Sequence, residues 1–115
     1  MKAKLAEEYS AIGEISKLVY QDDSPIHGLG LFAKENIPNK TFIHDTHIWS
    51  NMADSYINLK PNCMYNHSTK PNCKVGRTGN RIRLESITSI KKGDELLVDY
   101  NQNPEIELPQ EDWIN

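Results

Sequence analysis

The chain has 115 residues, a length that suits one domain. Its formal net charge is −3, and it lacks the basic patch or stripe that nucleic-acid binding needs. No apolar run approaches the roughly 20 residues of a membrane-spanning helix, and the charged start MKAKLAEEYS has no apolar stretch behind it, as a signal peptide would. We therefore expect an intracellular protein that contacts neither nucleic acid nor membrane.

The predicted elements, taken in chain order, are short and mostly strands. Apolar residues at one face of residues 2–12 predict a short N-terminal helix, which Gly13 would end. Strands are predicted where β-branched and aromatic residues gather or alternate with polar ones, at 14–21, 29–33, 41–49, 81–86 and 95–100. Turns are predicted at 22–28, 36–40, 78–80 and 91–94, and a helical turn followed by a loop at 50–64. This pattern predicts a mostly-β domain.

The charge of the chain is unevenly distributed. Residues 101–115 carry four acidic residues and no Lys or Arg, namely Glu105, Glu107, Glu111 and Asp112. A solvated acidic terminus explains this segment most simply. It could also attract a cationic partner such as a Lys-rich peptide.

The stretch YNHSTKPNC at residues 65–73 gathers several chemically active residue types. Together with Cys63, it gives the pattern C-x3-H-x5-C through His67 and Cys73. A closed zinc site needs four ligands, usually in closer cysteine pairs, so we expect no metal here and two free thiols. Asn66-His67-Ser68 also fits a glycan acceptor, which has no meaning in an intracellular protein.

The stretch GLGLFA at residues 28–33 satisfies the dinucleotide-binding pattern G-x-G-x-x-A. That pattern requires a helix directly after it, whereas here a strand and then the turn around Pro38 follow. The dinucleotide interpretation is therefore rejected. Two interpretations remain: a glycine-rich turn, or a place where the backbone approaches a ligand without interference from Cβ atoms.

Three separated stretches together resemble the SET-domain family of protein lysine methyltransferases: SPIHGLGLFA (24–33), NHSTKPNC (66–73) and IKKGDELLVDY (90–100). The resemblance covers residues 17–101, between an N-terminal extension (1–16) and an acidic tail (102–115). It implies a β-clip of several small twisted sheets with a C-terminal pseudoknot. It also implies transfer of a methyl group from S-adenosylmethionine to the amine of a lysine in a protein or peptide substrate.

The resemblance assigns roles to residues that match the family's motifs. The turn His27-Gly28-Leu29-Gly30 would lie along the cofactor, and Asn66 and His67 would hold its adenine and amino-acid ends. Tyr100 would stand at the methyl-transfer centre, where its hydroxyl would orient the lysine amine, and would also contact the cofactor.

The chain departs from larger family members in three ways. The segment between Ala33 and Asn66 leaves little room for the insert that shapes their substrate groove, so a homodimer could complete the groove. Thr69 stands where many members have Cys. The cysteine-rich zinc segment after the domain is absent, as in compact viral and bacterial forms, and Trp113 is the candidate to cover the cofactor instead.

Two other functions remain open at this point. The first is a non-catalytic interaction module on the same scaffold. The second is a small metal or thiol protein that uses Cys63, His67 and Cys73. Tyr56 and Tyr65 are candidates for the walls of a substrate channel, although core packing explains each of them as well. The sequence names neither the substrate nor the number of methyl groups added.

Overall fold

The computed structural model describes residues 10–102, and within this range it is built from strands with one short 3-10 helix. The mostly-β prediction is confirmed. The strands are β1 (Ser10–Ile12), β2 (Val19–Asp23), β3 (Leu29–Ala33), β4 (Phe42–Ser50), β5 (Ser55–Lys60), β6 (Asn66–His67), β7 (Cys73–Thr78), β8 (Arg81–Ser86) and β9 (Leu97–Val98). The 3-10 helix η1 follows at Tyr100–Gln102. No helix within the described range is long and apolar enough to cross a bilayer.

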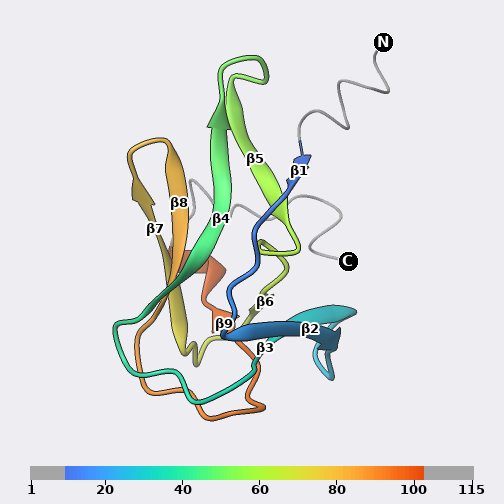
Figure 1. Cartoon of the computed structure of the whole chain (residues 1–115), viewed down its shortest axis with the longest axis vertical. Helices are drawn as coiled ribbons and strands as arrows, with labels where there is room; N and C mark the ends of the chain where they lie inside the picture. The colour runs from blue at the N-terminus through green and yellow to red at the C-terminus, as the bar shows by residue number, and fades with distance from the viewer. Residues whose placement is uncertain (1–9, 103–115) are drawn as a thin grey trace.

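The strands form two sheets. The larger has seven strands in the order β1-β5-β4-β8-β7-β9-β6, and the smaller is the β2-β3 hairpin. The central strands β5, β4, β8 and β7 pair antiparallel, whereas β1, β6 and β9 join the sheet through parallel pairs. Register shifts in β4, at Phe42/His44 and Asp45/His47, mark bulges that bend the sheet. The β2-β3 hairpin crosses below the long strands (Figure 1).

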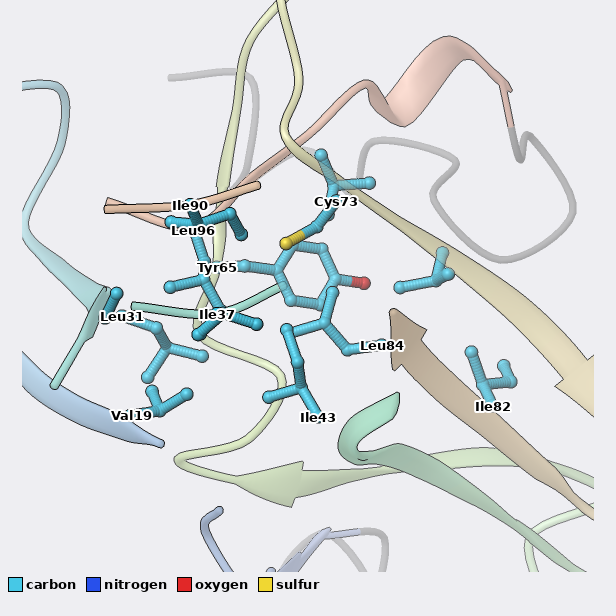
Figure 2. Packing of buried hydrophobic residues seen from close by; sticks show 13 residues of the cluster. Val19, Leu31, Ile37, Ile43, Tyr65, Cys73, Ile82, Leu84, Ile90 and Leu96 are labelled. Carbon is cyan, nitrogen blue, oxygen red and sulfur yellow. The ribbon is translucent and has the colours of Figure 1, made fainter. Parts of the chain in front are cut away.

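The core lies between the two sheets. Along β8 every second side chain is buried, so Ile82 and Leu84 point inward while the arginines between and before them do not. Leu31 from β3 and Leu96 close the other side, each fully buried. Figure 2 shows the Tyr65 ring among these side chains, beside Cys73 and Leu84. Tyr65 is therefore a core residue, and its role as a channel wall stays a prediction.

The segment 94–98 lies between two other parts of the chain. On one side the Leu96 amide donates to the Leu31 carbonyl, at 2.7 Å. On the other side the Leu97 amide donates to Asn72 Oδ1 at 2.8 Å, and β9 pairs in parallel with β6. Three stretches that are distant in the sequence thus become neighbours. That one of these stretches passes through a loop formed by another, which would make a pseudoknot, stays a prediction.

Several predicted element bounds are wrong. Residues 10–12 belong to β1, not to a helix, because they pair with residues 58–60 of β5; residues 2–9 lie outside the described range. The predicted loop over 50–64 contains β5, which is held between β4 and β1. The strand predicted at 14–21 begins only at Val19, and the one at 95–100 shrinks to Leu97–Val98 before η1.

Candidate active site

A cavity of about 580 Å³ opens where the three neighbouring stretches meet the large sheet. Its lining comes from the turn before β3, from β4 and β5, and from the segment that leads into β6. The lining residues are Ile26, His27, Gly28, Leu29, His47, Asn58, Lys60, Cys63, Met64, Tyr65, Asn66, His67 and Tyr100. A volume of this size is typical of a small-molecule site.

The glycine turn forms one wall of this cavity. Gly28 has a φ of 47°, a left-handed conformation that glycine adopts without steric cost, and the Ser24 amide donates to its carbonyl at 2.7 Å. Gly30 is buried behind the lining. A Cβ atom at Gly30 would overlap Glu95 Oε2 and lie 3.1 Å from Asn66 Nδ2. Glycine is therefore required at position 30 by the side chains packed against it.

The side chain of Asn66 is held in one orientation. Its Nδ2 donates to Glu95 Oε2 at 2.8 Å, and the carbonyl oxygens of His27 and Leu29 lie at 3.2 and 3.3 Å. With three acceptors around the nitrogen, the amide cannot flip without losing these bonds. Among residues 10–102, no hydrogen bond involves Oδ1. This oxygen is the acceptor that Asn66 can offer to a ligand in the cavity.

Asn72 joins the stretch 66–72 to the C-terminal stretch. Its Nδ2 donates to the Glu95 carbonyl and its Oδ1 accepts from the Leu97 amide, both at 2.8 Å. The Asn72 side chain thus satisfies one backbone carbonyl and one backbone amide of the segment 95–97, as the backbone of a neighbouring strand would. Asn72 thereby fixes the position of β9 beside the cavity.

His67 and Tyr100 meet at the end of β9. The Tyr100 amide donates to His67 Nδ1 at 3.1 Å, and the two rings lie 5.0 Å apart between centroids. Since Nδ1 accepts this bond, the neutral ring carries its proton on Nε2. Asp99 Oδ1 lies 3.9 Å from the same Nδ1. The backbone bond excludes an ion pair with Asp99 at this atom, because the ion pair would need a proton on the nitrogen that accepts the bond.

The hydroxyl of Tyr100 also has a defined direction. It donates to the Tyr65 carbonyl at 2.9 Å. A phenolic oxygen that donates its proton in this way still has lone pairs with which to accept. The group is therefore suited to accept a hydrogen bond from an amine rather than to give one.

Strands β4 and β5 of the large sheet also contribute to the lining. His47 on β4 faces Asn58 on β5 across the ladder, and Lys60 ends β5. Burial lowers the pKa of His47 to about 4, although a hydrogen bond with Asn58 opposes the shift, so the ring is neutral near pH 7. Among the lining residues that the structure describes, Lys60 is the lysine, and none is Asp or Glu. This part of the lining therefore suits an anionic ligand group.

A family model described as the SET domain matches residues 44–101, half of the chain. The chain belongs to the SET domain family. A SET and MYND domain-containing protein of Dictyostelium discoideum is 32% identical over 102 residues, which is 83% of this chain and 24% of that protein. The chain thus spans about a quarter of that relative's length.

Solved structures agree on the fold of this SET domain. A candidate histone methyltransferase of Plasmodium falciparum matches 75% of this chain and 95% of its own, with a TM-score of 0.63 and 24% identity. An inhibitor-bound humanized mutant of Polycomb Repressive Complex 2 from Chaetomium thermophilum matches 80% of this chain and 15% of that chain, with a TM-score of 0.58 and 18% identity. At these identities the similarity establishes the fold alone.

The residues predicted as the site of this SET domain mostly gather at one place. His27, Gly28, Leu29, Asn66, His67 and Tyr100 line the cavity, and Gly30 packs directly behind it. Trp113 lies outside the described residues. Tyr56 is not in the lining; its ring meets Trp49 edge-on, with centroids 5.3 Å apart. The individual roles of these residues stay predictions.

The structure adds residues that the sequence did not single out. His47, Asn58 and Lys60 enter the lining because β5 pairs with β4, and β5 was missed. Glu95 belongs to one of the three motif stretches. However, its carboxylate accepts hydrogen bonds from Asn66 and Ser24, which lie 29 and 71 positions earlier in the sequence. No local pattern marks such contacts.

The two thiols occupy different surroundings. Cys63 lines the cavity, whereas Cys73 is buried in the core, where burial raises its pKa to about 12. Within residues 10–102, no three His, Cys, Asp or Glu side chains gather so that they could hold a metal ion. The C-x3-H-x5-C pattern therefore does not correspond to a cluster in the described fold.

Proposed function

We propose that this SET domain is a protein lysine methyltransferase that uses S-adenosylmethionine as methyl donor and a lysine-containing protein or peptide as acceptor. The observation that carries the proposal is the convergence of Gly28, Asn66, His67 and Tyr100 on one cavity of about 580 Å³. These residues come from three distant stretches, and only the fold joins them. A cavity of this size is large enough for a nucleoside-sized cofactor.

The residues present fit the cofactor. The side-chain oxygen of Asn66 is an acceptor that the cofactor's ammonium group would need, and Lys60 in the same lining is a cation that the adjacent carboxylate would need. The turn at Gly28 lets backbone approach the ligand closely. Trp113 stays the candidate to cover the adenine, since an indole can stack on such a ring.

The sulfonium supplies a methyl carbon that an amine attacks in line, so that the carbon–sulfur bond breaks and its electron pair stays on sulfur. The protein then has to bring nitrogen, carbon and sulfur into line, which can lower a barrier by roughly 7–11 kcal/mol in well-oriented systems. No covalent intermediate with the protein is needed.

Tyr100 is placed to orient the acceptor amine. Because its hydroxyl proton is directed to the Tyr65 carbonyl, its oxygen can accept an N–H bond and leave the nitrogen lone pair pointing to the methyl group. The amine must lose its proton to solvent before it reacts. Desolvation and a nearby positive charge both lower a lysine pKa from its usual value of ~10.4.

Transfer of a labelled methyl group tests the proposal. The protein is incubated with methyl-labelled S-adenosylmethionine and a panel of lysine-rich proteins and peptides, each paired with a copy in which Arg replaces Lys. Label that mass spectrometry locates on a lysine side chain, and that is absent from the Arg copies, is the expected result. Binding of the cofactor without transfer to any member would favour the alternative, a non-catalytic interaction module.

A further inference from the structure

The carboxylate of Glu95 lies directly behind the wall of the cavity. Its Oε2 accepts a hydrogen bond from Asn66 Nδ2 at 2.8 Å, and its Oε1 accepts one from the Ser24 hydroxyl at 2.9 Å. The same Oε2 occupies the space that a Cβ at Gly30 would need. Asn66 and the glycine turn form part of the cavity wall. One layer of residues therefore separates the Glu95 carboxylate from a ligand in the cavity.

No cation of residues 10–102 pairs with this carboxylate. Both hydrogen-bond donors, an amide and a hydroxyl, are uncharged, and no ion pair of Glu95 occurs among residues 10–102. Glu95 is also half-buried, so solvent screens it only in part. Other carboxylates lie near this wall: Asp99 accepts from the Asn101 amide at 3.0 Å and lies beside His67, and Asp22 and Asp23 on β2 pair with Gly30 and Leu29.

We propose that the Glu95 carboxylate makes the cavity prefer the cationic methyl donor over the neutral product of the transfer. The inference rests on the proposed function and concerns which ligand the same site retains. S-adenosylmethionine and S-adenosylhomocysteine share adenine, ribose, ammonium and carboxylate groups. They differ by one methyl group and the positive charge on sulfur.

Hydrogen bonds to the shared groups hold donor and product equally and so give no discrimination. A fixed negative charge behind the wall attracts the sulfonium and has no such effect on the thioether. For a partly screened charge within about 10 Å, the gain is roughly three- to tenfold in affinity. The consequence is weaker competition of accumulated product with fresh donor for the site.

Glu95→Gln separates the charge from the hydrogen bonds. The glutamine amide oxygen can accept from Asn66, and its nitrogen can donate to the Ser24 hydroxyl oxygen. Calorimetric titration should show an unchanged Kd for S-adenosylhomocysteine and a roughly three- to tenfold higher Kd for S-adenosylmethionine. Glu85→Gln is the matched control, since Glu85 on β8 pairs with Lys74 away from the cavity, and neither Kd should change.

Glu95→Asp gives the complementary test. It keeps the charge but shortens the side chain, so both ligands should bind more weakly while the ratio of their Kd values stays that of the unmodified protein. The proposal is overturned if Glu95→Gln leaves the ratio unchanged, or if Glu95→Asp abolishes it. An unmodified protein that binds neither ligand would instead contradict the proposed function, which keeps the two failures distinct.

Discussion

The hydroxyl of Tyr100 donates a hydrogen bond to the carbonyl of Tyr65 across 2.9 Å, while the Tyr100 amide is bound to His67. The phenol is therefore oriented by the same stretch of chain that forms the cavity wall. Its ring lies edge-on to that of Tyr65, with centroids 6.1 Å apart. The oxygen is held by the fold before any ligand arrives, which is the condition for efficient orientation of an amine.

Tyr100→Phe removes this oxygen and keeps the ring packing. We expect the Kd for S-adenosylmethionine to change less than about threefold, whereas turnover falls by roughly 10²–10³, the usual cost of losing one positioned hydrogen-bonding group. Calorimetry and the labelled-methyl assay measure the two quantities. Tyr20→Phe on β2, where the ring stacks on Phe32, serves as control and should leave both unchanged. Full turnover by Tyr100→Phe would exclude the role given to the hydroxyl.

Gly30→Ala places a Cβ where Glu95 Oε2 lies and 3.1 Å from Asn66 Nδ2. The two side chains must move apart, so the Asn66 amide loses its orientation. We expect cofactor affinity to fall at least roughly tenfold, about 1.4 kcal/mol. Gly76→Ala on β7 is the matched control, because a Cβ there meets no atom within 4 Å. Equal cofactor affinity in both variants would show that the cavity does not depend on this packing.

Two buried histidines make the stability of the fold depend on pH. Burial lowers the pKa of both His44 and His47 from 6.5 to about 4. His44 accepts from the Ser16 amide through Nδ1 and bonds the Asn62 carbonyl through Nε2, which suits the neutral ring. The folded state therefore binds these protons less readily than the unfolded chain does.

The sign of the pH effect follows from these lowered pKa values. Above pH 6.5 the stability that the two neutral histidines contribute is fully present. This contribution is lost as the pH falls toward 4. At pH 5 the loss is roughly 2 kcal/mol for each histidine, at about 1.4 kcal/mol per pKa unit. Urea unfolding at pH 7 and pH 5 measures it, and His44→Gln should reduce the difference. An unfolding free energy that is equal at the two pH values would contradict this account of the histidines.

The two thiols should differ in reactivity and in their response to ligand. Cys63 lines the cavity, so saturating S-adenosylmethionine should slow its alkylation several-fold. Cys73 should stay unmodified in the folded protein with or without ligand, because it is 1% exposed and burial raises its pKa to about 12. Mass spectrometry of peptides after timed alkylation reports both sites. Faster labelling of Cys73 than of Cys63 would contradict the described packing.

Local patterns in the sequence were sufficient for part of the fold. The strand predicted at 29–33 from its short apolar run agrees with β3. The alternating strand at 81–86 agrees with β8, because alternation of buried and exposed residues follows from strand geometry. β5 was missed because its four inner residues are all half-buried, so they show no alternation. β1 was missed because its pairing with β5, rather than its own propensity, determines its conformation.

The candidate site could be predicted only through motifs. Gly28, Asn66 and Tyr100 belong to stretches that resemble a known family, and the resemblance placed them together. His47 and Lys60 carry no such mark, and they join the lining through strand pairing. The role of Glu95 likewise depends on contacts with Ser24 and Asn66 that only the folded chain creates.

The most direct test of the central claim is calorimetric titration of S-adenosylmethionine into the unmodified protein and into Asn66→Ala. Asn80→Ala, in the turn between β7 and β8, controls for the loss of an amide elsewhere. We expect saturable binding to the unmodified protein and to Asn80→Ala, with affinity lower by roughly tenfold or more in Asn66→Ala. Absence of binding to the folded unmodified protein, or equal binding to all three, would contradict the claim that this cavity holds the methyl donor through Asn66.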